Sequence, residues 1–126
     1  MRVKRKPVLW VASSRKDLKT FPHAVQYDVG HALLEAQDGG RGLNVKMMQG
    51  FGGGTVLEVI SDFQTDTYRA VYTVRFEQAI LVLHCFQKKS KRGVETPKAD
   101  KDLIEQRLRE ARETYARWLQ AENQKG

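Results

Sequence analysis

Hydrophobic residues near the start of the chain predict a strand followed by two helices. The run PVLWVA (residues 7–12) is β-branched and aromatic, and it ends at Ser13 and Ser14, both good helix N-caps. The next segment, SSRKDLKTF, predicts a short helix that Pro22 stops, and Pro22 can itself open the next helix. That second helix ends at Asp38-Gly39-Gly40, and its apolar stripe has helical spacing: Val25, Val29, Ala32, Leu33 and Ala36.

The middle of the chain changes to the spacing of strands. TVLEVIS (residues 55–61), TYRAVYTVRF (67–76) and AILVLHCF (79–86) are separated by short gaps, which predicts an antiparallel meander. In the second strand the aromatic residues share one face, and Arg69 lies on the other. AILVLHCF is apolar on both faces, so it is expected to be a central strand that is covered on each side at least in part.

A helix closes the chain from about residue 97, with an apolar stripe made of Ile104, Leu108, Ala111, Tyr115 and Trp118. The whole pattern predicts an α+β fold. It consists of an N-terminal strand and helical hairpin, then a three-stranded antiparallel meander joined in one sheet, then a C-terminal helix. Residues 1–126 are expected to form a single domain, because a chain of this length supports one modest core.

Charge adds the first functional information. The chain has 22 Lys and Arg against 15 Asp and Glu, a net charge of +7. A basic body raises the local concentration of polyanions, so nucleic acid is the first partner to consider. A soluble basic surface with no dedicated ligand would have the same composition.

Cysteine and histidine content argues against a disulfide or a metal site. One cysteine, Cys85, allows no intramolecular disulfide and no thiolate metal cage, which favours a reducing, cytoplasmic setting. The three histidines have neither ligand spacing nor carboxylate company, so neither a metal nor another cofactor is expected. No apolar run approaches the ~20 residues that span a bilayer, so no membrane association is expected.

The glycine-rich stretch GFGGG (residues 50–54) invites comparison with a phosphate-binding loop. It lacks the Gly-Lys-Ser/Thr ending of a P-loop, and it precedes a strand rather than a helix. A flexible entry to the strand is therefore the better interpretation.

Positive charge concentrates where the third meander strand ends, in the segment QKKSKR with Lys88, Lys89, Lys91 and Arg92. Arg69 lies on the neighbouring strand, so two strand ends could place cations together and open to solvent. A guanidinium suits a bidentate grip on phosphate, and such cations would stabilise a pentacoordinate transition state. The alternative is that Arg69 pairs with Glu58 and that the lysines form a solvated edge.

His84, at the end of the central strand, is the histidine with the best claim to a role. A buried, hydrogen-bonded imidazole is the simpler interpretation, and an active-site role is the other. Cys85 is expected to be a small core residue.

Three motifs in a fixed order now resemble a known family. TYRAVYTV, AILVLHCFQKKS and ETPKAD leading into a helix look like the phage-related branch of the RelE/HigB toxin superfamily. WVASSRKDLKTFP and the glycine-rich approach to LEVI are similar as well, so the likeness runs from about Trp10 to the final helix.

The resemblance implies an antiparallel sheet with helices against one face, and a toxin of a type II toxin–antitoxin system. Such toxins cleave messenger RNA, usually at the ribosome, without metal, and leave 2′,3′-cyclic phosphate ends. A helix-turn-helix antitoxin encoded beside the toxin would neutralise it. An endoribonuclease of this kind has chiefly to align the RNA backbone and stabilise charge.

Carried over to this sequence, the resemblance gives Arg69, Lys88 and Lys89 as catalytic residues. Lys46, Arg75, Lys91 and Arg92 would bind RNA, and His84 or Glu58 would be the general base, with Lys46 a further candidate. Two alternatives stay open. One is a toxin like those of the ParE branch, which inhibits DNA gyrase by binding it and catalyses nothing. The other is an RNA-binding module without catalysis.

Overall fold

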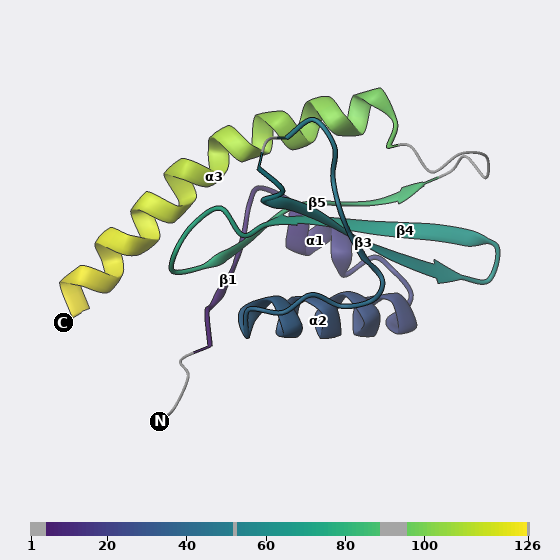
Figure 1. Cartoon of the computed structure of the whole chain (residues 1–126), viewed down its shortest axis with the longest axis horizontal. Helices are drawn as coiled ribbons and strands as arrows, with labels where there is room; N and C mark the ends of the chain where they lie inside the picture. Colours follow the sequence, from purple (N-terminus) through teal and green to yellow (C-terminus); the bar gives the residue numbers. More distant parts are fainter. Residues whose placement is uncertain (1–4, 52, 89–95, 126) are drawn as a thin grey trace.

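In a computed structural model, the protein forms one mixed sheet between helices (Figure 1), described for residues 5–51, 53–88 and 96–125. The elements in chain order are β1 (Val8–Trp10), α1 (Ser14–Leu18), α2 (His23–Gln37), β2 (Val45–Met47), β3 (Val56–Phe63), β4 (Asp66–Thr73), β5 (Ile80–Lys88) and α3 (Lys98–Lys125). The sheet has five strands in the order β1-β5-β4-β3-β2. β1 pairs in parallel with β5, and the other neighbours are antiparallel.

The predicted α+β class, the helical hairpin, the β3-β4-β5 meander and the C-terminal helix are confirmed. The strand count is not, because β2 adds a strand at the edge beside β3. The sheet is mixed rather than antiparallel, because β1 joins β5 in parallel. The expectation of helices against one face is also wrong: α2 and α3 lie on opposite sides of the sheet (Figure 1).

Each face of the sheet has its own hydrophobic core. The first core joins α1 and α2 to one face, and Val25 and Val29 of α2 are fully buried in it. The second joins α3 to the other face, with Ile104 and Ala111 fully buried. β5 is buried along its length except at Gln87, which fits the prediction of a strand covered on both sides.

A β-bulge in β5 decides which side chains meet α3. Val71 pairs with His84 while the next residue, Tyr72, pairs with Val82, so Leu83 is the extra residue. A bulge of this kind disrupts the ladder and changes the alternation of side chains. Leu83 therefore joins the core beneath α3, and His84, its neighbour, also contacts α3.

The C-terminal helix is longer than the sheet it covers. α3 has 28 residues, and at a rise of about 1.5 Å per residue it is about 42 Å long. Its fully packed positions are Ile104, Arg107 and Ala111, all in its first half. Figure 1 shows the C-terminal part of α3 continuing beyond the strands. Among the residues that the structure describes, no helix, α3 included, is both long and apolar enough to cross a membrane.

Candidate functional site

Charged and polar side chains gather on the face of the sheet that α3 covers. Strand register places Thr67 opposite Lys88, Arg69 opposite Phe86, and Val71 opposite both His84 and Glu58, so these residues share one face. The segment leading into α3 and its first turns add further polar groups. We call this set the polar cluster, which comprises Glu58, Arg69, His84, Lys88, Thr96, Asp100 and Arg107.

A buried ion pair forms one half of the polar cluster. Arg69 Nη1 donates to Glu58 Oε1 at 2.7 Å, and the two side chains are 5% and 6% exposed. Thr96 Oγ1 donates to the other oxygen of Glu58 at 3.1 Å. A buried carboxylate is stable only where such bonds replace its hydration. Glu58 therefore fastens β4 and the start of the α3 segment to β3.

This arrangement corrects the expectation of a solvent-open cationic site. Arg69 is 4% exposed and Lys88 is 6% exposed, because this half of the sheet face is covered. The Arg69–Glu58 pair, the alternative interpretation, is confirmed, whereas a solvated edge is wrong for Lys88, which lies within β5. Lys89, Lys91 and Arg92 lie outside the described residues.

His84 forms the other half of the polar cluster, and both of its ring nitrogens face a polar neighbour. Nε2 lies 2.8 Å from Asp100 Oδ1, and Nδ1 lies 3.5 Å from Arg107 Nη1. Arginine can only donate, so Nδ1 accepts and Nε2 carries the proton that it donates to Asp100. The ring also stacks on Phe86, with centroids 4.7 Å apart. The buried, hydrogen-bonded imidazole is thus confirmed.

Arg107 links three elements of the fold. Its Nη1 donates to the Leu83 carbonyl at 3.0 Å, and its Nη2 donates to Ser13 Oγ at 3.1 Å. Sequence reasoning passed over Arg107, although a signal was available. An arginine occupies a core position of the apolar stripe, three residues after Ile104 and four before Ala111.

Asp100 is the second member of the polar cluster that sequence reasoning missed. Its side chain is 25% exposed, against 9% for that of His84 and 6% for that of Glu58. Of these two carboxylates, it is the one that a ligand in solvent can approach. No local pattern marks it, because its partner His84 is 16 residues away in the sequence.

The structure places the predicted RNA-binding residues apart from one another. Lys46 is exposed on β2 and pairs in register with Glu58, so it borders the polar cluster. Arg75 follows the far end of β4, where it donates to the Phe51 carbonyl at 2.9 Å and to Thr55 Oγ1 at 3.3 Å. Arg75 therefore holds the glycine-rich stretch against the end of β4 rather than joining the polar cluster.

Metal-binding groups were also sought in the described part of the chain. Residues 5–51, 53–88 and 96–125 contain no group of three His, Cys, Asp or Glu side chains that could hold a metal ion. The glycine-rich stretch precedes β3, as predicted, with Gly53 and Gly54 at positive φ. A Cβ on Gly54 would lie 2.8 Å from Met47 Sδ, so the approach of β2 to this turn requires glycine.

Cys85 lies in the first core, and its thiol is expected to be inert. Burial raises the pKa of the Cys85 thiol to about 12, and the Asp17 carboxylate raises it further. Since the thiolate is the nucleophile, the folded protein should not react with iodoacetamide or a disulfide reagent at pH 8. In denaturant, the single cysteine of the chain should react with one equivalent. Equal reaction rates in both states would contradict the burial of Cys85.

These observations define a class of protein: an α+β domain with a mixed sheet between helices and a polar cluster beneath α3. The chain belongs to a phage-derived protein family, described as "Phage derived protein Gp49-like (DUF891)", which matches residues 16–109. The match includes every member of the polar cluster. Comparison with curated proteins gives no match, and neither does comparison with solved structures.

Proposed function

We propose that this protein is the toxin of a type II toxin–antitoxin system and that it cleaves messenger RNA at the ribosome without a metal ion. The observation that carries the proposal is the pairing of His84 with Asp100 at 2.8 Å, next to a partly exposed carboxylate oxygen. Membership of a phage-derived family and the net charge of +7 support it.

The proposed reaction is an internal transesterification. The 2′-hydroxyl oxygen attacks the adjacent phosphorus, the bond from phosphorus to the 5′-oxygen breaks, and a 2′,3′-cyclic phosphate and a 5′-hydroxyl remain. Asp100 takes the proton of the 2′-hydroxyl, while the Nε2 proton of His84 holds its carboxylate in position. Solvent returns a proton to the 5′-oxygen.

Cations near the polar cluster would balance the phosphate charge. Lys46 is exposed at the border of the polar cluster, and Lys88 lies on the same face of the sheet. Arg69 is a positioning residue in this scheme, because its guanidinium holds Glu58 rather than facing solvent. Lys89, Lys91 and Arg92 would continue the phosphate-binding surface beyond Lys88.

Induced expression tests the proposal directly. Brief induction should arrest growth, deplete messenger RNA and produce new RNA ends that carry a 2′,3′-cyclic phosphate, as measured by end-specific RNA sequencing. Co-expression of the neighbouring reading frame, the proposed helix-turn-helix antitoxin, should restore growth. Growth arrest with intact messenger RNA would contradict the nuclease proposal and leave the toxin proposal standing.

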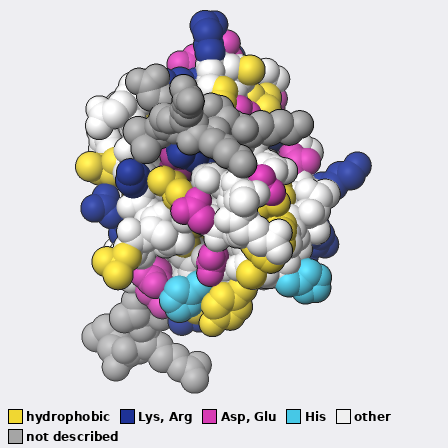
Figure 2. Space-filling view, turned by 90° about the vertical axis from the view of Figure 1, so that its right-hand side faces the viewer, with side chains coloured by type: hydrophobic (Ala, Val, Ile, Leu, Met, Phe, Trp, Pro, Cys, Tyr) yellow, Lys and Arg dark blue, Asp and Glu magenta, His cyan; other side chains and the backbone are white. Residues whose placement is uncertain are grey.

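A second candidate function is a toxin like those of the ParE branch, which inhibits DNA gyrase by binding. The internal partners of Arg69, His84 and Arg107 favour it, because these groups then serve the fold alone. The outer face of α2 favours it too: Tyr27 is 74% exposed, and no Lys or Arg occurs in His23–Gln37. Figure 2 shows hydrophobic and histidine side chains gathered at the level of α2.

The order of events after induction separates the two candidates. A nuclease depletes messenger RNA before any DNA damage response, whereas a gyrase inhibitor triggers that response first. The double substitution Tyr27→Ser and Leu43→Ser removes two exposed apolar groups without opening a core, since Leu43 is fully exposed. Toxicity should persist in this variant for a nuclease, and its loss in a folded variant would favour the binding toxin.

A further inference from the structure

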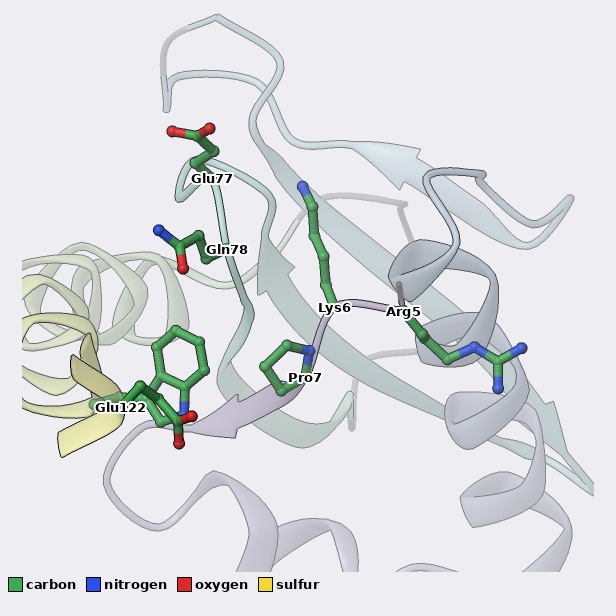
Figure 3. A pocket seen from close by; sticks show the side chains of 7 residues that line it. Arg5, Lys6, Pro7, Glu77, Gln78 and Glu122 are labelled. Atoms are coloured by element: carbon green, nitrogen blue, oxygen red, sulfur yellow. The ribbon is translucent and has the colours of Figure 1, made fainter. Parts of the chain in front are cut away.

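A cavity of about 670 Å³ opens under the C-terminal part of α3, away from the polar cluster (Figure 3). Its walls come from the chain before β1, the β4–β5 turn and the overhanging helix. They include Lys6, Pro7, Glu77, Gln78, Trp118 and Glu122. The cavity exists because α3 continues past the sheet, so this stretch of helix has no strand beneath it.

Two contacts fix the tryptophan wall of the cavity. Tyr115 lies one turn before Trp118, and its hydroxyl accepts a hydrogen bond from the backbone N–H of Gln78 at 3.1 Å. The rings of Tyr115 and Trp118 are stacked with centroids 6.0 Å apart. Trp118 is only partly buried, so an indole surface held in place by these contacts remains available to a ligand.

The cavity has an acidic balance in a basic protein. Glu77 and Glu122 supply two carboxylates, and Lys6 supplies one ammonium group. Arg5 also borders the cavity, but its guanidinium is held by Asp38 at 2.8 and 3.2 Å and points away from the other lining residues in Figure 3. Within the described part of the chain, neither Glu77 nor Lys6 forms an ion pair.

We propose that this cavity receives an arginine side chain presented by a protein partner. A guanidinium stacks on an indole face, and tryptophan is the best aromatic partner for a cation. Its planar fork can donate two hydrogen bonds to one carboxylate, such as Glu77. Pro7 and Trp118 offer apolar surface to the methylene groups of the arginine.

Charge favours a basic peptide group over RNA as the occupant. Phosphate would meet two carboxylates and gain one ammonium group, whereas a guanidinium gains two attractions and meets one repulsion. Removal of each charged group should therefore shift affinity in opposite directions for the two ligand classes. The experiment uses these signs and does not depend on nuclease activity.

The test follows the indole N–H signal of Trp118 in a ¹H–¹⁵N spectrum of the full chain, assigned with a Trp10→Phe variant. The probes are N-acetyl-arginine amide, the uncharged N-acetyl-citrulline amide and adenosine monophosphate. We expect a saturable shift with the arginine probe and a weaker response with citrulline. Glu77→Gln should weaken arginine binding, and Lys6→Gln should strengthen it, by about two- to fivefold each, as for exposed ion pairs.

Matched controls guard against misreading. Glu113→Gln removes a carboxylate from the same helix outside the cavity and should change nothing. Nucleotide binding that weakens in Lys6→Gln, with no response to arginine, would overturn the proposal in favour of RNA. The absence of any saturable shift with the arginine probe would overturn it as well.

Discussion

Replacement of Glu58 with alanine is expected to lower the free energy of unfolding by about 3–5 kcal/mol, the usual cost of breaking a buried ion pair on one side. The substitution takes away the carboxylate that accepts from Arg69 at 2.7 Å and from Thr96 at 3.1 Å. The buried guanidinium stays in place while its opposite charge is lost. Urea denaturation of the purified variant measures the change.

Two controls give this prediction its specificity. The double substitution Glu58→Leu and Arg69→Met removes both charges and should recover most of the loss, because a hydrophobic replacement of both partners is often neutral. Glu35→Ala removes a carboxylate from a surface pair with His31 and should change stability by no more than about 0.5 kcal/mol. If Glu58→Ala is as stable as Glu35→Ala, the pair does not fasten the sheet.

Replacement of Asp100 with asparagine should reduce RNA cleavage by about 10²- to 10⁴-fold, the usual contribution of a general base. Asparagine keeps an oxygen that can accept from His84 Nε2 but cannot take a proton from the 2′-hydroxyl. The fold should therefore survive while the chemistry is lost. Primer extension on translating ribosomes measures the cleavage rate, and thermal unfolding checks that the variant is folded.

A matched control lies one position beyond, on the same helix. Asp102 pairs with Lys98 on the surface, with 62% of its side chain exposed, and Asp102→Asn should leave cleavage unchanged. Cleavage by Asp100→Asn at the wild-type rate would remove Asp100 from the mechanism. If the wild-type protein itself cuts no RNA, the nuclease proposal fails, and the binding candidate gains support.

Local patterns were enough to locate most of the elements. The helical stripe of Val25, Val29 and Ala36 predicted α2, and all three are buried. The alternation around Arg69 placed the aromatic side chains in one core and the guanidinium on the opposite face. Periodicity works here because each helix or strand must bury one side, and the spacing along the chain records which side that is.

Nonlocal pairing was beyond those patterns. β2 has three residues, of which only Val45 is buried, so no period identifies it. The parallel pairing of β1 with β5 joins residues about 70 positions apart, Val8 with Ile80 at its start. The bulge at Leu83, which directs His84 toward α3, depends on register with β4.

The candidate site divides in the same way. The sequence by itself determined that Arg69 lies outside the aromatic core, with Glu58 within reach as one of two possible partners. Only the tertiary structure decided between that ion pair and an open phosphate grip, because α3 and Thr96 cover this face and a buried guanidinium requires a carboxylate. The pairing of His84 with Asp100 likewise required α3 to be docked, since no rule of spacing brings a strand and a distant helix turn together.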